Sequence, residues 1–233
     1  MRIGLFGYGK MGRMIDRLSG GRGHQVVARI DGPTQEIPFD QMDVAIDFSQ
    51  PEAAVENISK CLKNGVPVIS GTTGWLAEFN RVTELCREEG GAFLYASNFS
   101  LGVNLFFELN RYLSNLMSGI PGYSVRMTEI HHSGKKDAPS GTAISLAEGI
   151  ITQSEYQTWT LGEGVSESIP IISERTGDVP GTHRITYESE VDRIEIEHKA
   201  HNREGFAQGA LLAAEWLVGK EGVFEMKDVL NLR

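Results

Sequence analysis

Five short apolar runs recur in the first hundred residues, and stretches with helical spacing of apolar residues separate them. The runs are nearly continuous rather than alternating: Arg2–Phe6, Gln25–Ile30, Val44–Phe48, Val66–Ile69 and Phe93–Ala96. Near-continuous runs are typical of strands buried on both faces, as in a parallel sheet. Helices are expected over Met11–Leu18, Pro51–Lys63 and Leu76–Glu88. This alternation predicts an α/β fold with a Rossmann-like, doubly wound parallel sheet.

The middle of the chain follows a different pattern. Helices are expected over Leu105–Met117 and Thr142–Ile151. Strands are expected at Tyr123–Ile130, Ile169–Ile172, Arg184–Tyr187 and Ile194–Lys199. The last of these alternates apolar and charged residues, which indicates a sheet with one face less covered than the other. We therefore expect a smaller α+β domain with an open mixed sheet.

The last expected helix, over Gly205–Lys220, is amphipathic, and we expect it to return to the first domain. The expected division is therefore 1–101 with 203–233 for one domain, and 102–202 for the other. No internal repeat or low-complexity segment interrupts this organisation.

The charge balance limits the classes of partner. The chain has 22 Lys and Arg against 31 Asp and Glu, a formal net charge of −9. An acidic chain repels phosphate backbones, so we expect no nucleic-acid partner. No apolar run approaches the ~18 residues that span a bilayer, and the glycines near the N-terminus do not resemble a signal peptide. With only two cysteines, the sequence predicts a soluble, cytoplasmic protein.

A glycine motif directly follows the first expected strand. Gly7-Tyr8-Gly9-Lys10-Met11-Gly12 has the G-x-G-x-x-G spacing that lets a backbone approach a pyrophosphate at a helix N-terminus. Asp31 ends the second strand, where a carboxylate accepts hydrogen bonds from an adenosine ribose. The pattern alone also suits a turn without a ligand, but its place between a strand and a helix favours dinucleotide binding.

Two further segments follow predicted strands of the same sheet. Gly71-Thr72-Thr73-Gly74 comes after the fourth strand, and Ala96-Ser97-Asn98-Phe99-Ser100 overlaps the end of the fifth. The carboxyl ends of parallel strands form the edge where open α/β sheets bind ligands. Small residues there allow a cofactor to approach the backbone, although ordinary turn chemistry would explain either segment alone.

The segment from Glu129 to Ala143 gathers cationic groups in an acidic chain. His131, His132, Lys135 and Lys136 lie within six residues. Ser140-Gly141-Thr142 then begins a helix, whose N-terminus favours a carboxylate. This combination predicts an anionic substrate of the dicarboxylate type rather than a metal site, because lysines beside the histidines would oppose a divalent cation. A solvated basic loop is the alternative.

These segments together resemble the dihydrodipicolinate reductases. The resemblance lies in E-x-H-H-x-x-K-x-D-A-P-S-G-T, G-T-T-G, A-S-N-F-S and Lys220–Leu230, and it covers the whole chain. It implies an N-terminal domain that binds NADH or NADPH and a mixed-sheet domain that binds substrate and builds a homotetramer. The implied reaction is reduction of 4-hydroxy-tetrahydrodipicolinate in the diaminopimelate route to lysine.

The resemblance also implies roles for individual residues. His131 would be the catalytic histidine, and Lys135 the proton donor. His132, Gly141 and Thr142 would contact the substrate, with Ser140 at the same helix N-terminus. The residues expected to bind the nucleotide are Gly7, Tyr8, Gly9, Lys10, Met11, Gly12, Asp31, Gly71, Thr72, Thr73, Ala96, Ser97, Asn98 and Phe99.

Two departures from the family pattern concern the cofactor. The glycine turn is one residue shorter than usual, and Gly32 stands where members that use both cofactors often have a basic residue. Asp31 without a neighbouring cation favours NADH over NADPH. Two other classes of function stay open: another NAD-dependent amino-acid or hydroxy-acid dehydrogenase, and a non-catalytic dinucleotide sensor. A sensor acting on DNA would need a helix-turn-helix and a basic face, which the sequence lacks.

Overall fold

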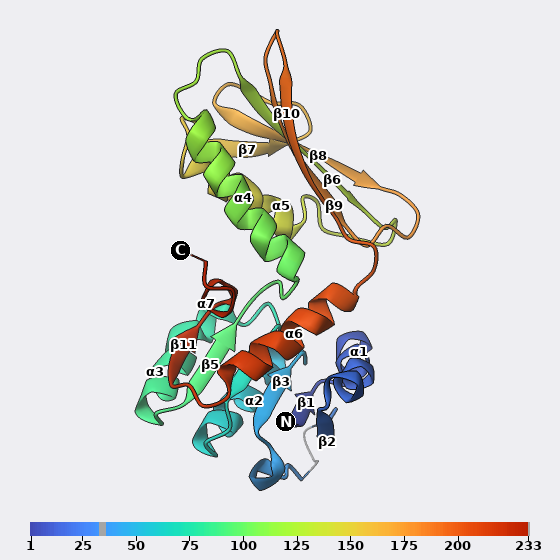
Figure 1. Cartoon of the computed structure of the whole chain (residues 1–233), viewed down its shortest axis with the longest axis vertical. Coiled ribbons are helices and arrows are strands. Elements are labelled where there is room, and N and C mark those ends of the chain that lie inside the picture. Colours follow the sequence, from blue (N-terminus) through green and yellow to red (C-terminus); the bar gives the residue numbers. More distant parts are fainter. Residues whose placement is uncertain (33–35, 233) are drawn as a thin grey trace. The chain divides into compact units, whose positions relative to one another are not determined.

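The computed structural model describes residues 1–32 and 36–232 and forms two compact units (Figure 1). The first unit combines Met1–Leu101 with the chain from Glu204 onward, and the second unit is Gly102–Arg203. The first unit is thus built from two separate stretches of sequence, with the second unit inserted between them.

The first unit contains a six-stranded sheet in the order β11-β5-β4-β3-β1-β2, and all its strand pairs are parallel. Its strands are β1 (Arg2–Phe6), β2 (Gln25–Ile30), β3 (Val44–Asp47), β4 (Val68–Ser70), β5 (Ala92–Tyr95) and β11 (Gly222–Phe224). The strand order reverses direction beside β1, which is where such sheets bind ligands. The predicted Rossmann-like sheet is confirmed, whereas β11 was not predicted.

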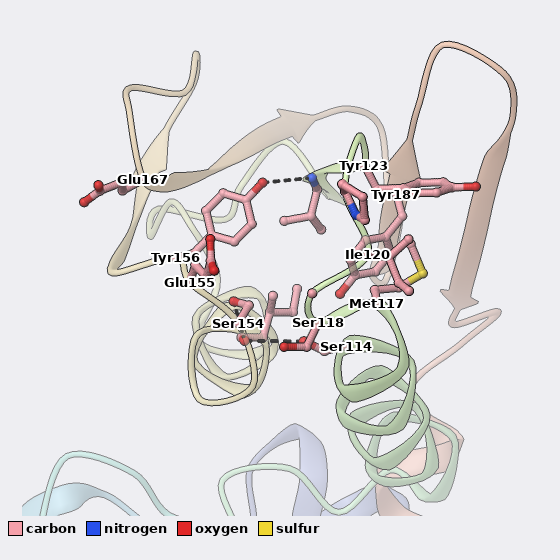
Figure 2. A pocket seen from close by; sticks show the side chains of 14 residues that line it. Ser114, Met117, Ser118, Ile120, Tyr123, Ser154, Glu155, Tyr156, Glu167 and Tyr187 are labelled. Carbon is pink, nitrogen blue, oxygen red and sulfur yellow. Dashed lines mark hydrogen bonds between the residues drawn. The ribbon is translucent and has the colours of Figure 1, made fainter.

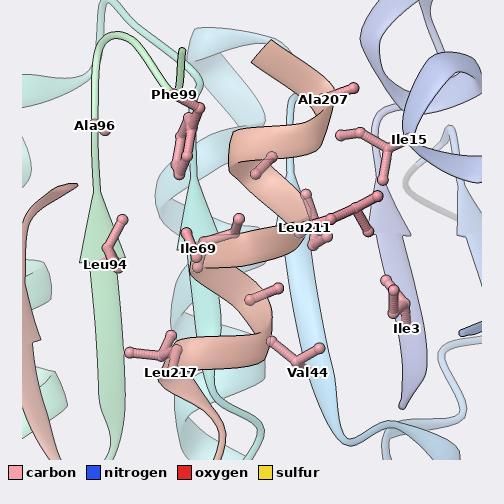
Figure 3. Close-up of a cluster of buried hydrophobic side chains, with 14 of the residues drawn as sticks. Ile3, Ile15, Val44, Ile69, Leu94, Ala96, Phe99, Ala207, Leu211 and Leu217 are labelled. Atoms are coloured by element: carbon pink, nitrogen blue, oxygen red, sulfur yellow. The ribbon is translucent and has the colours of Figure 1, made fainter. Parts of the chain in front are cut away.

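Helices cover both faces of this sheet and bury two apolar cores. The helices are α1 (Lys10–Ser19), α2 (Pro51–Lys63), α3 (Phe79–Glu88), α6 (Glu204–Leu217) and α7 (Met226–Val229). Figure 3 shows α6 lying across the sheet, with Leu211 and Leu217 packed near Ile3, Val44 and Leu94. Side chains from α2 and α3 form the core on the other face. The returning C-terminal helix therefore completes the first unit.

The second unit has a mixed five-stranded sheet in the order β10-β9-β6-β8-β7. Its strands are β6 (Ser124–His131), β7 (Thr158–Leu161), β8 (Ser168–Arg175), β9 (Thr182–Glu188) and β10 (Arg193–Lys199). Both of its helices, α4 (Leu101–Met117) and α5 (Gly141–Ile151), contribute to one core against this sheet. The predicted mixed sheet is confirmed, although β7 was not predicted.

Within residues 1–32 and 36–232, none of the helices combines the length and the hydropathy that a membrane-spanning helix requires.

Candidate active site

The glycine turn after β1 is shaped by close backbone contacts. Gly7 has φ +88°, and a Cβ there would lie 2.2 Å from the carbonyl oxygen of Phe48. A Cβ on Gly12 would lie 2.2 Å from the carbonyl oxygen of Gly7, so α1 packs directly on the turn. A Cβ on Gly9, in contrast, would meet no atom within 4 Å. The turn therefore leaves space beside Gly9, in front of the first amides of α1, where a phosphate binds favourably.

The other members of the turn differ in what their side chains do. The Tyr8 hydroxyl donates to Asp16, so its ring lies along α1. Lys10 is exposed, whereas Met11 is partly buried against the core. Arg13, which the sequence interpretation did not single out, is exposed and donates from Nε to the Tyr8 carbonyl oxygen at 3.1 Å. Lys10 and Arg13 are thus two cations beside the turn.

A cavity of about 430 Å³ lies beside this turn. It is lined by the carboxyl ends of β1 and β2 and by one side of α2, with Asp31 and Gly32 among its residues. The backbone N–H of Tyr8 donates to Oδ1 of Asp31 at 3.0 Å, which fixes the carboxylate near the turn. Lys60 is the cation in the described lining, and it pairs with Glu56 at 2.6 Å. The cavity therefore joins the glycine turn to Asp31, both of which were predicted to bind the nucleotide.

A buried carboxylate organises the G-T-T-G segment. Asp47 is fully buried, and it accepts hydrogen bonds from Ser49 Oγ (2.6 Å), Ser70 Oγ (2.8 Å) and Thr72 Oγ1 (2.7 Å). Burial raises the pKa of Asp47 above its usual value, and the hydrogen bonds from these three hydroxyls offset only part of this rise. Trp75 Nε1 donates to the Thr72 carbonyl oxygen at 2.7 Å. Thr72 therefore holds the segment in place with its side chain rather than presenting its hydroxyl to a ligand.

Among the other residues expected to bind the nucleotide, some are exposed and others are buried. Thr73 and Ser97 are exposed. Phe99 is 1% exposed and packs on Phe48, with ring centroids 5.7 Å apart. Ala96 is buried too, and its N–H donates to the Ser70 carbonyl oxygen, which joins the segments after β4 and β5 at one edge of the sheet. The structure thus brings these segments together, but Phe99 serves the core with its side chain.

The histidine pair lies at the end of β6. His131 is the last residue of the strand and is 8% exposed, whereas His132 follows the strand and is half-buried. The His132 carbonyl oxygen accepts from the N–H of Lys135 at 3.0 Å, which closes a tight turn. Because the strand ends here, the two imidazoles are not forced onto opposite faces of the sheet.

Lys135 has a carboxylate partner within the same loop. Its Nζ lies 2.8 Å from both carboxylate oxygens of Asp137, and this ammonium group lowers the pKa of Asp137. The Lys135 side chain is 22% exposed and that of Asp137 is 60% exposed. Lys136 is exposed on the same loop. Asp137 therefore fixes the position of the Lys135 ammonium within the loop.

The N-terminus of α5 follows this loop. Ser140 is its N-cap residue and is 2% exposed; its Oγ accepts from the Ala143 N–H at 3.2 Å. The Ser140 hydroxyl therefore caps the helix. Gly141 is exposed and Thr142 is half-buried in the first turn. These two positions are where the helix N-terminus faces outward.

A buried charge network lies behind these groups. Glu129, on β6, is 1% exposed, and its Oε1 accepts from Arg175 Nη2 (2.8 Å) and from the Ser140 N–H (3.3 Å). Its Oε2 lies 2.5 Å from Nδ1 of His131, within ion-pair distance but not aligned as a hydrogen bond. His183 Nε2 lies 3.2 Å from Ser140 Oγ. Four segments of the second unit therefore meet at Glu129.

Three of these residues have the ligand atoms of a metal site. Glu129, His131 and His183 offer atoms that lie within 4.8 Å of one another. However, the Arg175 guanidinium already neutralises the Glu129 carboxylate, and a fixed cation opposes a divalent metal ion. We therefore interpret the group as a hydrogen-bonded charge network.

The second unit also contains a separate cavity of about 420 Å³ (Figure 2). Ile150 and Ser154, near the C-terminal end of α5, line it, whereas Gly141 begins the same helix. Tyr156 and Tyr187 form part of its wall, and the Tyr156 hydroxyl accepts from the Val125 N–H at 3.2 Å. The sequence-predicted site therefore lies at the opposite end of α5 from this cavity.

Comparison with protein families agrees with this arrangement. A model of the N-terminal part of dihydrodipicolinate reductase matches residues 1–99, and a model of its C-terminal part matches residues 102–230. The chain belongs to the dihydrodipicolinate reductase family. The glycine turn and Asp31 lie in the first matched part, and the network around Glu129 in the second.

Individual relatives cover the chain from end to end. It is 51% identical to a curated 4-hydroxy-tetrahydrodipicolinate reductase of Christiangramia forsetii, over 99% of this chain and 98% of that protein. It is 37% identical to the reductase of the same name from Anaplasma marginale, over 99% and 100%. A dipicolinate-bound dihydrodipicolinate reductase from Paenisporosarcina sp. TG-14 is 22% identical, with TM-score 0.79 over 97% of each chain. This last likeness shows that the fold is shared.

Arg175 and His183, which lie in the charge network around Glu129, were not among the site residues predicted from the sequence. His183, Ile185 and Tyr187 alternate along β9 and are all buried, so a period of two placed His183 on the core face. Arg175 lies beyond the predicted strand, yet it pairs with His131 in the register of β6 and β8. The alternation was therefore a usable signal for His183, whereas Arg175 required knowledge of the strand register.

Burial of His183 predicts a pH-dependent stability. Desolvation, followed by the nearby His131, lowers the pKa of His183 from 6.5 to about 3. The unfolded chain then binds a proton that the folded chain does not, so stability falls as the pH drops below 6.5 toward 3. Between pH 7 and pH 5.5 we expect His183 to account for a loss of about 1 kcal/mol.

Denaturant unfolding at both pH values measures this loss. In His183→Gln the difference between the two pH values should shrink by about 1 kcal/mol, because the titrating group is gone. The exposed His201 provides the control, since His201→Gln should leave the difference unchanged. An undiminished pH dependence in His183→Gln would show that His183 is not the group responsible.

Proposed function

We propose that this chain reduces 4-hydroxy-tetrahydrodipicolinate with a reduced nicotinamide cofactor, in the diaminopimelate route to lysine. The observation that carries the proposal is the segment from His131 to Thr142, which joins a histidine, a lysine and a helix N-terminus in one unit. The 51% identity to a curated reductase of that name, over nearly the whole chain, supports it. The first unit binds the nucleotide in this proposal, and the second binds the small dicarboxylate.

Each site residue between His131 and Thr142 that the sequence singled out has a task in this reaction. The 4-hydroxyl of the substrate leaves as water, which creates a ring C=C bond conjugated with the imine. The cofactor, when bound, would supply a hydride to a carbon of this conjugated system. Lys135 then donates a proton to the substrate as the charge develops, which is the role of a general acid. Gly141 and Thr142 bind a substrate carboxylate at the positive end of α5. His132 contacts the substrate, and His131 supports the charge beside Lys135.

The loop also explains how an anionic substrate engages Lys135. In the structure the Asp137 carboxylate occupies the position next to its ammonium. A substrate carboxylate of the same charge and geometry competes for that position and turns the ammonium from Asp137 toward the substrate. Asp137 therefore keeps the side chain ordered before the substrate arrives, which reduces the entropy lost on binding.

An NADH-oxidation assay with freshly generated 4-hydroxy-tetrahydrodipicolinate tests the proposal directly. Turnover dependent on both compounds is the expected result. Activity with an amino acid or a hydroxy acid, but not with this substrate, would instead indicate another NAD-dependent dehydrogenase. Nucleotide binding without any turnover would indicate a sensor.

We infer that NADH is at least as good a cofactor as NADPH. Asp31 repels a 2′-phosphate, Gly32 supplies no charge, and Lys60 is already paired with Glu56. The expected result is a kcat/KM for NADH equal to or above that for NADPH, with Asp31→Ser shifting the ratio toward NADPH. Asp40→Asn, an exposed acidic residue outside the cavity lining, should leave the ratio unchanged. A tenfold preference of the unaltered chain for NADPH would refute this inference.

We further propose that the chain forms a homotetramer through the second unit and works in the cytoplasm. Both helices of that unit pack on one face of its sheet. The opposite face carries ion pairs such as Arg184–Glu197 (2.6 Å) and Arg126–Glu188 (3.0 Å), and closed symmetric assembly would cover it. Light scattering should give four times the chain mass of 25.6 kDa, and a species of 25.6 kDa would contradict the proposal.

The state of the cysteines supports the proposed location in the cytoplasm. The thiols of Cys61 and Cys86 are free, in accord with a reducing compartment.

A further inference from the structure

We propose that Glu129 is a positioning residue: its buried carboxylate sets the orientation and tautomer of His131 and ties that imidazole to the N-terminus of α5. The inference rests on the proposed function, in which His131 and the start of α5 both serve the substrate. It assigns a role to a side chain that does not itself reach the substrate.

The geometry places one carboxylate between the two parts of the substrate site. Oε1 of Glu129 holds the Ser140 N–H at 3.3 Å, and Oε2 lies 2.5 Å from His131 Nδ1. Glu129 and His131 are two residues apart on β6, so both side chains lie on the same face of the sheet. A shift of Glu129 would therefore move the imidazole and the helix N-terminus together.

Arg175 fixes this carboxylate in its charged form. Its Nη2 donates to Oε1 of Glu129 at 2.8 Å and also to the Asp137 carbonyl oxygen at 2.6 Å. Burial raises the pKa of Glu129, but the close His131 ring and the hydrogen bonds from Arg175 and Ser140 hold it well below its usual range. A carboxylate buried to this extent is tolerated because it is paired and hydrogen-bonded. Glu129 is thus a fixed negative charge beside His131.

A carboxylate next to Nδ1 selects one tautomer of the imidazole. An ionised carboxylate can only accept a hydrogen bond, so the proton of a neutral His131 belongs on Nδ1. The unprotonated Nε2, on the other side of the ring, is then the hydrogen-bond acceptor. At Gly181 a Cβ would lie 3.1 Å from Nε2, so the glycine keeps that side of the ring open. The 2.5 Å separation of Nδ1 and Oε2 already favours a proton on Nδ1 in the free chain, and we expect the geometry of the pair to become more linear when the substrate binds.

His183 restrains the ring from a second direction. The two imidazoles meet edge to face, with centroids 5.2 Å apart, and Nε2 of His183 lies 3.2 Å from Ser140 Oγ. Desolvation keeps His183 neutral, because its pKa is lowered to about 3. His183 therefore packs against His131 without adding a charge that would compete for Glu129.

Nitrogen-15 NMR of the unaltered chain labelled at histidine provides the first test. The proposal requires the Nδ1–H tautomer for the neutral form of His131, identified by the signals that disappear in His131→Asn. Observing the Nε2–H tautomer would overturn the proposal. This measurement does not depend on turnover, so it separates a failure of the positioning role from a failure of the proposed reaction.

A double-mutant cycle in kcat provides the second test. We expect Glu129→Gln to lower kcat by about 10²-fold, as loss of a partner that orients a catalytic group does, while the KM for NADH is unchanged. In a chain that already carries His131→Asn, the same substitution should change kcat less than threefold. The amide oxygen of a glutamine can still accept from the Ser140 N–H, so Glu129→Gln removes only the charge beside His131. Equal losses in both backgrounds would show that Glu129 only supports the fold.

The exposed acidic residue Glu174, next to Arg175, offers a matched control. Glu174→Gln makes the same chemical change outside the network and should leave kcat and the tautomer unchanged. A thermal unfolding curve should be measured for each variant, so that kcat is assayed at a temperature at which every variant is folded. If Glu129→Gln does not fold, the tautomer measured in the unaltered chain still decides the proposal.

Discussion

Replacing Lys135 by alanine is expected to lower kcat by about 10²–10⁴-fold while leaving the affinity for NADH unchanged. Lys135 lies in the loop between β6 and α5 of the second unit, whereas the nucleotide segments belong to the first unit. If Lys135 donates the proton, its loss removes an interaction made in the transition state, so kcat falls. If it only attracts the substrate, KM rises and kcat is nearly unchanged.

Lys136→Ala is the matched control, because Lys136 has the same charge and is the next residue of the loop. Turnover and NADH fluorescence titrations of both variants should be measured side by side. Equal and mild losses in the two variants would mean that the loop is a basic patch and that Lys135 is not the acid.

The second large effect concerns α6 and stability. A Cβ at Gly209 would lie 1.7 Å from the carbonyl oxygen of Phe99, a contact with backbone that a side-chain rotation cannot relieve. We expect Gly209→Ala to lower the free energy of unfolding by about 3 kcal/mol or more, the upper range for overpacking. Because Phe99 belongs to the segment after β5, the affinity for NADH should fall as well.

Gly205→Ala in the same helix is the control. Its Cβ would lie 3.7 Å from Ser100 Oγ, an ordinary contact, and alanine favours a helix over glycine by about 0.5–1 kcal/mol. Denaturant unfolding should therefore give opposite signs for the two substitutions. A Gly209→Ala chain as stable as the unaltered one would show that α6 does not approach the segment after β5 so closely.

The sequence predicted the parts of the fold that have a strong periodic signal. The bounds of β1, β2 and α2 agree with the structure, because buried strands are continuous apolar runs and Pro51 marks the first turn of a helix. Strands β7 and β11 were missed because neither is a buried apolar run: their residues are half-buried or exposed, whereas the equally short β3 and β4 are fully buried. Their neighbours, β8 and β5, determine them through hydrogen bonding.

The loop residues of the candidate site could be predicted from the sequence, but the buried residues that support these loops could not. The histidines, Lys135 and the start of α5 are contiguous, so a single segment indicates their chemistry. Arg175 lies 46 residues from Glu129, and only the pairing of β6 with β8 brings the two together. Phe99 shows the opposite difficulty, because a residue within a binding motif turns its side chain into the core.

The divided first unit has a consequence for synthesis on the ribosome. Residues of α6 supply much of one core, and β11 pairs with β5 at the edge of the sheet, so the N-terminal hundred residues cannot complete their domain when they emerge. The second unit is contiguous and becomes available in full while the first still lacks its final helix. Domains fold as units during synthesis, so the segment made in the middle is the first able to finish. The last thirty residues then close a domain whose first strand was made at the start.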